Sequence, residues 1–297
     1  MYIKSTFKGI NTLRNFELYL NLLILILKKN FILIIKNNFK SFIFNNFTGF
    51  NMKSTEQMDF YLKTLTLSRI QEIYVKEAEN AAKTKSSYQD YLFKLVETEV
   101  LSKIDRSINR RIQIAGFPMI RKLEEFDFSY QPKLDEKLIR ELANLNFMDD
   151  AKNIILLGPP GVGKTHLAVA LGIKACILRK RVEFYSANAI AHLLAANENI
   201  GNLKSILERF ARIDLLIIDE LGYLDLNKIN ASLFFQLIAK RYEKKSIIIT
   251  SNKPFEEWGS IFGDDGVAAA IIDRILHHCY PFFINGNSYR MKNLLNI

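Results

Sequence analysis

Apolar runs alternate with amphipathic segments through the second half of this chain. Buried strands are predicted at residues 153–157, 182–185, 214–219 and 246–250, and helices at about 134–145, then 164–179, 188–196, 202–211 and 230–243. Alternating strands and helices build parallel sheets, and strands that are apolar on both faces are buried on both. The pattern therefore predicts an α/β fold in which helices cover both faces of a parallel sheet.

Residues 58–114 show a different pattern, with apolar side chains at three- and four-residue spacing among charged ones. This periodicity predicts a small helical N-terminal domain over residues 52–115. Glycine and proline at 116–118 and 126–132 interrupt it, so residues 116–133 are predicted to be a linker, with the α/β domain at 134–297.

Residues 1–51 form a leader of mostly Phe, Ile, Leu, Asn and Lys. Its apolar stretch is broken by Lys28 and Lys29, whereas a membrane span needs about 20 uninterrupted apolar residues. A secretory signal is not expected, because no small-residue cleavage site follows the apolar stretch. The favoured interpretation is translated non-coding sequence upstream of a start at Met52. A membrane-associated segment and some other role stay open.

The net charge of +10 suggests nucleic-acid binding until it is divided along the chain. The leader has seven basic residues and one acidic residue, so it carries +6 and the other residues only +4. A DNA-binding hypothesis therefore needs a local patch of basic residues. The candidates are Lys103, Arg106, Arg110 and Arg111, which helical spacing places along one side, and the cluster Arg179, Lys180 and Arg181. A solvated helix face is the competing interpretation of the first group.

The two cysteines, Cys176 and Cys279, make neither a disulfide framework nor a CxxC pair. This usage favours a reducing, cytoplasmic setting. Cys279 follows His277 and His278, but three adjacent residues lack the ligand spacing of a zinc site, so we do not expect metal binding from that run.

The strongest chemical signal is a G-x-x-x-x-G-K-[ST] motif between a predicted strand and a predicted helix. It comprises Gly158, Pro159, Pro160, Gly161, Val162, Gly163, Lys164 and Thr165, followed by His166. Glycines permit a tight loop whose N–H groups surround phosphates, the lysine reaches the β- and γ-phosphates, and the threonine hydroxyl binds Mg²⁺. The motif predicts an NTP-binding loop that uses residues 158–166.

A second signal is the apolar run of residues 215–218, which ends in two carboxylates. Asp219 is predicted to bind Mg²⁺ together with Thr165. Glu220 is predicted to activate the water that attacks the γ-phosphate, which turns nucleotide binding into hydrolysis.

Taken together, these residues show that the chain from Met52 to its C-terminus resembles a known protein family. The sequence resembles the IstB-type helper ATPases of insertion sequences, relatives of the DnaC helicase loaders within the AAA+ group of P-loop NTPases. The resemblance rests on the phosphate loop and on the runs Asp214–Tyr223, Thr250–Asn252, Ile272–His278 and Ser288–Arg290.

The resemblance implies further roles. Asn252 would be the polar sensor beside the γ-phosphate, and Arg274 would be an arginine finger that reaches a neighbouring subunit's nucleotide. ATP and Mg²⁺ would be the cofactors. The partners would be double-stranded DNA bound without sequence preference, a transposase, and further copies of the chain in an oligomer. The chain ends soon after Arg290, which leaves little room for a helical lid with a second sensor arginine.

Two other functions use the same loop. A replicative helicase loader of the DnaC type would grip a helicase through its N-terminal domain. A small-molecule kinase would transfer phosphate to a metabolite, but Asp219 followed by Glu220 favours water as the acceptor, so no small-molecule substrate other than ATP is expected.

Overall fold

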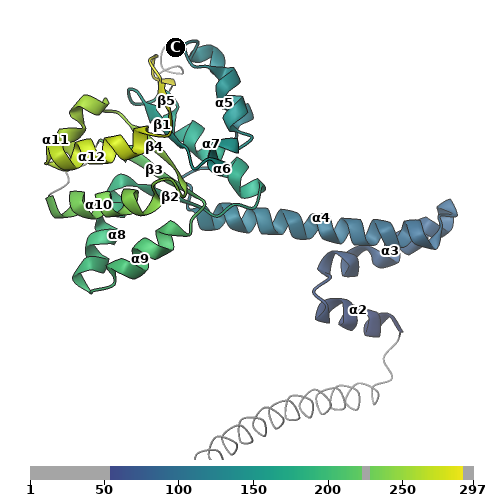
Figure 1. The fold of residues 1–297 in the computed structure, drawn as a ribbon. Helices are drawn as coiled ribbons and strands as arrows, with labels where there is room; N and C mark the ends of the chain where they lie inside the picture. The colour runs from purple at the N-terminus through teal and green to yellow at the C-terminus, as the bar shows by residue number, and fades with distance from the viewer. Residues whose placement is uncertain (1–53, 223–227, 290–297) are drawn as a thin grey trace, which may run out of the picture. The chain divides into compact units, whose positions relative to one another are not determined.

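A computed structural model describes residues 54–222 and 228–289 of the chain (Figure 1). The leader of residues 1–51, Tyr223 and Arg290 lie outside the described residues, so the interpretations of the leader stay predictions. The described residues fall into two compact units that meet between Glu99 and Val100. The predicted domain boundary at residue 115 likewise stays a prediction.

Between residues 54 and 115 the structure describes three helices: α2 (Ser54–Thr64), α3 (Ser68–Thr84) and α4 (Tyr88–Ala115). In the first unit, Leu62, Ile70 and Leu95 form a small buried cluster. The buried carboxylate of Glu99 accepts hydrogen bonds from the backbone N–H groups of Arg69 (2.8 Å) and Ile70 (3.0 Å). Glu99 therefore satisfies the free N–H groups at the start of α3, a position where negative charge is favourable.

Within the described residues, five parallel strands form one sheet in the order β2-β3-β4-β1-β5 (Figure 1). The strands are β1 (Asn153–Leu157), β2 (Val182–Ser186), β3 (Leu215–Leu221), β4 (Ser246–Ser251) and β5 (Cys279–Phe283). The predicted parallel α/β fold is confirmed. β5 was not predicted, because Pro281 interrupts a short run that lies between polar residues.

Helices cover the sheet on both faces, as predicted. The second unit contains α5 (Glu136–Leu142), α6 (Asn146–Asp149), α7 (Lys164–Ile177), α8 (Ala187–Asn199), α9 (Leu203–Ala211), α10 (Lys228–Arg241), α11 (Trp258–Phe262) and α12 (Asp265–Leu276). Three short 3₁₀ helices accompany them: η1 (Leu123–Glu125), η2 (Phe128–Tyr130) and η3 (Phe255–Glu257).

The two layers follow from the alternation of side chains along each strand. In β1, Ile154 and Leu156 belong to the core that contains α5, α6 and α7. Ile155 and Leu157 belong to the core formed with α8 to α12. β1 also lies at the point where the connections diverge, since α7 leads away to β2 while β4 and β5 flank β1. Ligands of open α/β sheets bind beyond the carboxyl ends of strands at such a point.

In the described part of the chain, no helix combines the length and apolar character needed to cross a bilayer.

Candidate nucleotide-binding site

The candidate phosphate loop occupies the predicted place between β1 and α7. β1 ends at Leu157 and α7 begins at Lys164, with Gly163 as its N-terminal cap. The Lys164 ammonium donates hydrogen bonds to the carbonyl oxygens of Gly158 (2.7 Å) and Pro159 (2.8 Å). The start of α7 supplies free N–H groups and a partial positive charge, and Lys164 places a full positive charge on the same loop.

Tight packing requires glycine at three positions of this loop. Gly158, Gly161 and Gly163 have φ values of +154°, +85° and +100°. A Cβ at Gly158 would lie 2.2 Å from the carbonyl oxygen of Ile284, and one at Gly161 would lie 2.0 Å from Ser288 Oγ. No side chain fits at these distances, so the loop follows a path that only glycine permits.

Asp219 joins the loop to the centre of the sheet. Its buried carboxylate accepts hydrogen bonds from Thr165 Oγ1, with distances of 2.9 and 3.1 Å to its two oxygens. It also accepts one from Thr250 Oγ1 at 2.5 Å. A threonine hydroxyl and a carboxylate therefore meet beside the start of α7. Oxygen atoms of these kinds are the ligands that Mg²⁺ prefers.

An irregularity in β3 separates the two neighbouring carboxylates. The register between β3 and β4 shifts between Ile218 and Leu221, and Glu220 has a left-handed φ of +61°. Such a bulge re-aims one side chain of a strand, and left-handed backbone is strained for a residue other than glycine. The backbone N–H of Glu220 donates a hydrogen bond to Thr250 Oγ1 at 2.9 Å. As a result Asp219 is buried while Glu220 is exposed beside it.

Asn252, the predicted polar sensor, lies just beyond the end of β4, and its role stays a prediction. Its Oδ1 is buried and has no hydrogen-bond donor among the described residues. Gly222 makes room for it, because a Cβ at Gly222 would lie 2.2 Å from that oxygen. A buried polar atom without a partner is costly, so this amide is suited to a ligand or a water molecule.

The predicted linker supplies a wall of the site that the motif gave no means of predicting. His166 Nε2 lies 2.8 Å from the carbonyl oxygen of Lys122, and the ring of Phe126 packs edge-on against His166 at 5.2 Å between centroids. A Cβ at Gly163 would lie 2.5 Å from Phe126. Glycine and proline mark this segment as a linker, and its local pattern does not indicate contact with the phosphate loop.

The C-terminal residues form a second unpredicted wall. The N–H of Tyr289 donates to the carbonyl oxygen of Gly161 at 2.9 Å. The ring of Tyr289 packs edge-on against Tyr130 of η2, with 5.3 Å between centroids. Residues near 130 and 289 thus meet beside the phosphate loop, a contact between distant segments that local periodicity does not encode.

Arg274, the predicted arginine finger, is held by groups of its own helix layer. Its guanidinium donates to the carbonyl oxygen of Ala270 at 3.0 Å and lies 4.6 Å from the ring centroid of Phe235 in α10. Both partners belong to the helix layer that contains α10 and α12. Its role in a neighbouring subunit's site stays a prediction.

The candidate DNA-binding cations fall into two groups. Lys103, Arg106 and Arg110 are exposed along α4, as helical spacing predicts. Arg111 turns away from this row and lines a cavity of about 600 Å³. Lys180, Arg181, Arg209 and Arg212 line the same cavity, as do Glu183 and Glu208.

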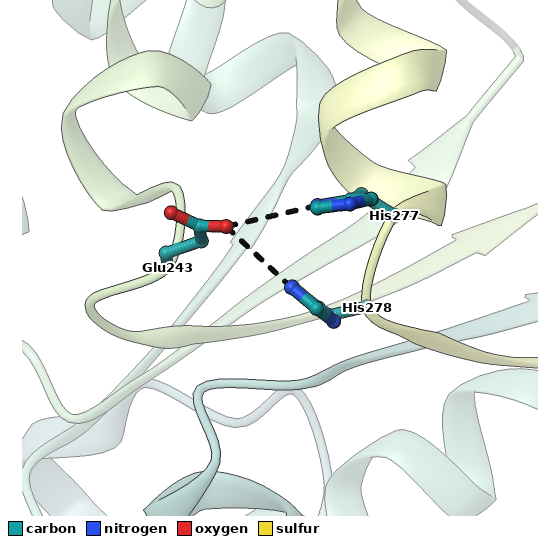
Figure 2. Close-up of side chains that lie close together, drawn as sticks. All are labelled: Glu243, His277 and His278. Carbon is teal, nitrogen blue, oxygen red and sulfur yellow. Dashed lines mark ion pairs between the residues drawn. The ribbon is translucent and has the colours of Figure 1, made fainter.

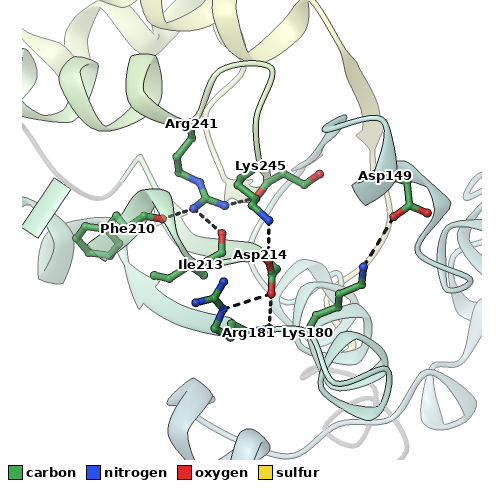
Figure 3. Close-up of polar contacts among 9 residues, drawn as sticks. Asp149, Lys180, Arg181, Phe210, Ile213, Asp214, Arg241 and Lys245 are labelled. Carbon is green, nitrogen blue, oxygen red and sulfur yellow. Dashed lines mark hydrogen bonds and ion pairs between the residues drawn. The ribbon is translucent and has the colours of Figure 1, made fainter. Parts of the chain in front are cut away.

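In the second candidate cluster, Arg179 to Arg181, two of the three side chains form ion pairs (Figure 3). Lys180 pairs with Asp149 at 3.8 Å, and Arg181 pairs with Asp214 at 3.6 Å. Asp214 also pairs with Lys245 at 2.6 Å. Arg179 of this cluster is exposed, with a left-handed φ of +61°.

Figure 3 also shows a buried arginine that no sequence signal indicated. Arg241 is fully buried and donates to the carbonyl oxygens of Phe210, Ile213 (3.0 Å) and Ser246 (2.7 Å). Burial lowers the pKa of Arg241 to about 10, which leaves it charged at neutral pH. It ties the end of α9 to the start of β4, at the opposite end of that strand from Asn252.

The residues present fit a nucleotide with Mg²⁺. The glycine-lined loop carries a lysine, and Thr165 and Asp219 supply oxygen ligands. Beyond the neighbouring strand lies Asn252 Oδ1, which has no donor among the described residues. Comparable clusters of a lysine, hydroxyl and carboxylate oxygens suit the triphosphate and its cation.

Known proteins with similar sequences are ATP-binding proteins of insertion sequences. The family described as IstB-like ATP binding protein matches residues 61–296. The insertion sequence IS21 ATP-binding protein of Pseudomonas aeruginosa is 45% identical, over 72% of this chain and 81% of that protein. The corresponding IS5376 protein of Geobacillus stearothermophilus is 42% identical, over 80% and 94%. Among solved structures, AMPPCP-bound DnaA from Aquifex aeolicus is 23% identical, with a TM-score of 0.49 over 61% of this chain and 55% of that chain.

Proposed function

This chain belongs to the IstB-like ATP-binding protein family, and we propose that it is an ATP-hydrolysing helper of DNA transposition. One observation supports hydrolysis above all. At the carboxyl edge of the sheet, Thr165 at the end of the phosphate loop donates hydrogen bonds to the carboxylate of Asp219. Asn252 extends this edge with an amide oxygen that no described residue contacts as a donor, and Glu220 extends it with an exposed carboxylate.

Each of these residues has a distinct role in the proposed reaction. The loop and Lys164 bind the phosphates of ATP, while Thr165 and Asp219 hold Mg²⁺. When bound, Mg²⁺ neutralises charge on the phosphates. Asn252 orients the attacking water, and Glu220 accepts its proton. The bulge supports this division, because it keeps Asp219 buried at the cation position and turns the next carboxylate outward.

As a transposition helper, the protein would also act on a transposase and on DNA. The relatives at 45% and 42% identity are proteins of insertion sequences, so the partner we propose is the transposase of the same element. DNA would be gripped through phosphate contacts made by exposed cations, with Lys103, Arg106 and Arg110 on α4 as the favoured row. Phosphate contacts give affinity without reading sequence, which suits a protein that must accept many targets.

Assembly would complete the active site. We assign Arg274 to the nucleotide of a neighbouring copy, where a guanidinium stabilises charge that develops during hydrolysis. Its contacts with Ala270 and Phe235 keep it within its own helix layer, which is compatible with action on a second subunit.

The test is ATP hydrolysis by the purified chain, with and without duplex DNA, over a range of protein concentrations. DNA-stimulated turnover that rises more than linearly with concentration is expected. A variant with glutamine at positions 103, 106 and 110 should keep basal turnover and lose stimulation, with a shallower salt dependence of DNA binding. Linear turnover that ignores DNA would contradict the helper function and direct the search to a phosphoryl acceptor.

A further inference from the structure

Two turns far from the phosphate loop in the sequence bring together two imidazoles and a carboxylate (Figure 2). Glu243 lies in the turn after α10, and His277 and His278 lie between α12 and β5. One carboxylate oxygen, Glu243 Oε1, is 3.7 Å from His277 Nδ1 and 3.5 Å from His278 Nε2. The ligand atoms of the three residues all lie within 4.8 Å of one another.

We propose that Glu243, His277 and His278 bind a divalent transition-metal ion, with Zn²⁺ as the best match. Two imidazole nitrogens and one carboxylate oxygen form a ligand set typical of zinc. Ligand atoms about 2.1 Å from a tetrahedral ion lie roughly 3.4 Å apart. The two measured separations, 3.5 and 3.7 Å, are close to that value before any ion draws the ligands inward. The three side chains are at least partly exposed, so water can complete the coordination.

The backbone on both sides of the site is held in place. Glu243 has a left-handed φ of +55°, in a turn closed by hydrogen bonds from the N–H groups of Lys244 (2.9 Å) and Lys245 (3.1 Å) to the carbonyl oxygen of Arg241. The carbonyl oxygen of His278 accepts from the N–H of Asn153 in β1 at 2.7 Å. Ligands on fixed backbone lose little entropy when they bind an ion.

Tyr242 competes for one ligand atom. Its hydroxyl lies 2.6 Å from His277 Nδ1, and the two rings are stacked at 29°. At this distance the phenol hydroxyl donates to Nδ1 when the imidazole carries its proton on Nε2. An ion that binds Nδ1 has to displace this hydrogen bond. Tyr242→Phe should therefore strengthen metal binding.

Cys279 is a poor candidate for a further ligand although it follows the histidines in sequence. It is the first residue of β5 and packs against the core. Among the described residues, the ligand atoms that converge here are those of Glu243, His277 and His278, and the Cys279 sulfur is not one of them. The third ligand therefore comes from Glu243, which sequence spacing could not indicate.

The site would connect the end of α10 to the end of α12. His277 caps α12 one turn beyond Arg274, so a bound ion would fix the end of the helix that carries the proposed finger. Metal binding itself does not depend on ATP hydrolysis or on assembly, and it can be measured without either.

The experiment is a calorimetric titration of the full chain, without a polyhistidine tag, with Zn²⁺. The protein is stripped of metal beforehand, and excess Mg²⁺ is present to occupy oxygen-only sites. Saturable binding of one Zn²⁺ per chain is expected. His277→Ala and His278→Ala should each weaken it about tenfold or more, at least as much as loss of an outer partner of a metal site costs. Glu243→Gln should also weaken it.

Controls separate this site from adventitious binding. The chain has four histidines, and His192→Ala removes an exposed one on α8, so it should bind Zn²⁺ like the unchanged chain. Titration with Co²⁺ should give visible absorption bands that both histidine variants lose. Thermal unfolding in chelator should be the same for all variants. The proposal is overturned if the two histidine variants bind Zn²⁺ as well as the unchanged chain does, or if the unchanged chain shows no saturable binding. Weaker Zn²⁺ binding by Tyr242→Phe would overturn only the assignment of His277 Nδ1 as the ligand atom.

Discussion

Thr165 at the start of α7 and Asp219 in β3 lie 54 positions apart, and the hydroxyl of the first donates to both carboxylate oxygens of the second, at 2.9 and 3.1 Å. Asp219 in turn accepts from Thr250 at the end of β4. Three segments of the chain therefore fix a single carboxylate. The carboxylate of the candidate cation site is therefore held by β3, β4 and the start of α7.

Replacing Lys164 with alanine should abolish tight ATP binding. A hydrogen bond to a charged group contributes about 1.5–3 kcal/mol, which corresponds to roughly a ten- to 150-fold rise in Kd. Equilibrium titration with a fluorescent ATP analogue measures the change. The control is Lys174→Ala, on the same helix, where the side chain pairs with exposed Glu124. Equal affinity in the two variants would argue against the phosphate role of Lys164.

Replacing Glu220 with glutamine should separate binding from turnover. The amide keeps the shape of the side chain but accepts no proton, so hydrolysis should fall about 10²- to 10⁴-fold while ATP affinity stays close to that of the unchanged chain. Single-turnover hydrolysis and a binding titration together give the answer. Glu256→Gln, an exposed position in η3, is the control and should change neither. Normal turnover would exclude Glu220 as the base.

The strands of this protein were largely predictable and the site only partly so. β1 and β4 match the prediction because their apolar runs are complete and are bounded by polar residues. β3 extends to Leu221, past the predicted end at residue 219, because a bulge lets the strand continue through two carboxylates. The helical stretch predicted at 58–114 contains three helices, since apolar spacing does not show where a helix breaks at Leu67 or Lys85.

Contacts between distant segments account for the features that were missed. Nothing near Tyr289 indicates that it meets Gly161, and Arg241 lies in a basic run that suggests exposure although its side chain is fully buried. Motif spacing predicts the loop and the carboxylates because their function needs a fixed local order. It does not predict the walls around them.

Gly222→Ala should impair turnover through Asn252. The added Cβ would lie 2.2 Å from Asn252 Oδ1, and a misplacement of about 1 Å in an active site can cost 10²-fold in rate. Gly201→Ala is the matched control. That residue also has a positive φ, +71°, but a Cβ added there would meet no atom of the described residues within 4 Å. Steady-state hydrolysis of both variants, compared at equal folded fraction, separates the steric effect from backbone strain.

Arg241→Met should be strongly destabilising. The substitution removes a charged group that donates to three buried carbonyl oxygens, and the loss of these hydrogen bonds should cost about 3–5 kcal/mol in the free energy of unfolding. Denaturant unfolding measures it. Arg140→Met is the comparison, because Arg140 forms an exposed pair with Glu136 and should contribute no more than about 1 kcal/mol. A similar small effect at both positions would contradict the structural role of Arg241.

Arg274→Ala should leave ATP binding intact and abolish hydrolysis. The decisive measurement mixes this variant with Lys164→Ala. Each is inactive alone, but a mixed assembly contains sites with an intact loop from one copy and an intact finger from the other, so partial activity should return. The control partner for Arg274→Ala is a chain with both substitutions, which supplies no finger and should restore nothing. If the first mixture stays inactive while both variants assemble, the finger does not act between subunits.

The sheet order sets the point during synthesis at which the candidate nucleotide-binding site can form. Among the described strands, β1 hydrogen-bonds with β4 and β5 alone, and the phosphate loop that follows it contacts Ser288 and Tyr289. A ribosome must therefore release almost the entire chain before β1 has a neighbouring strand. A nascent chain that ends before β4 exposes an unpaired apolar strand, and one that ends before Ser288 lacks these contacts to the phosphate loop.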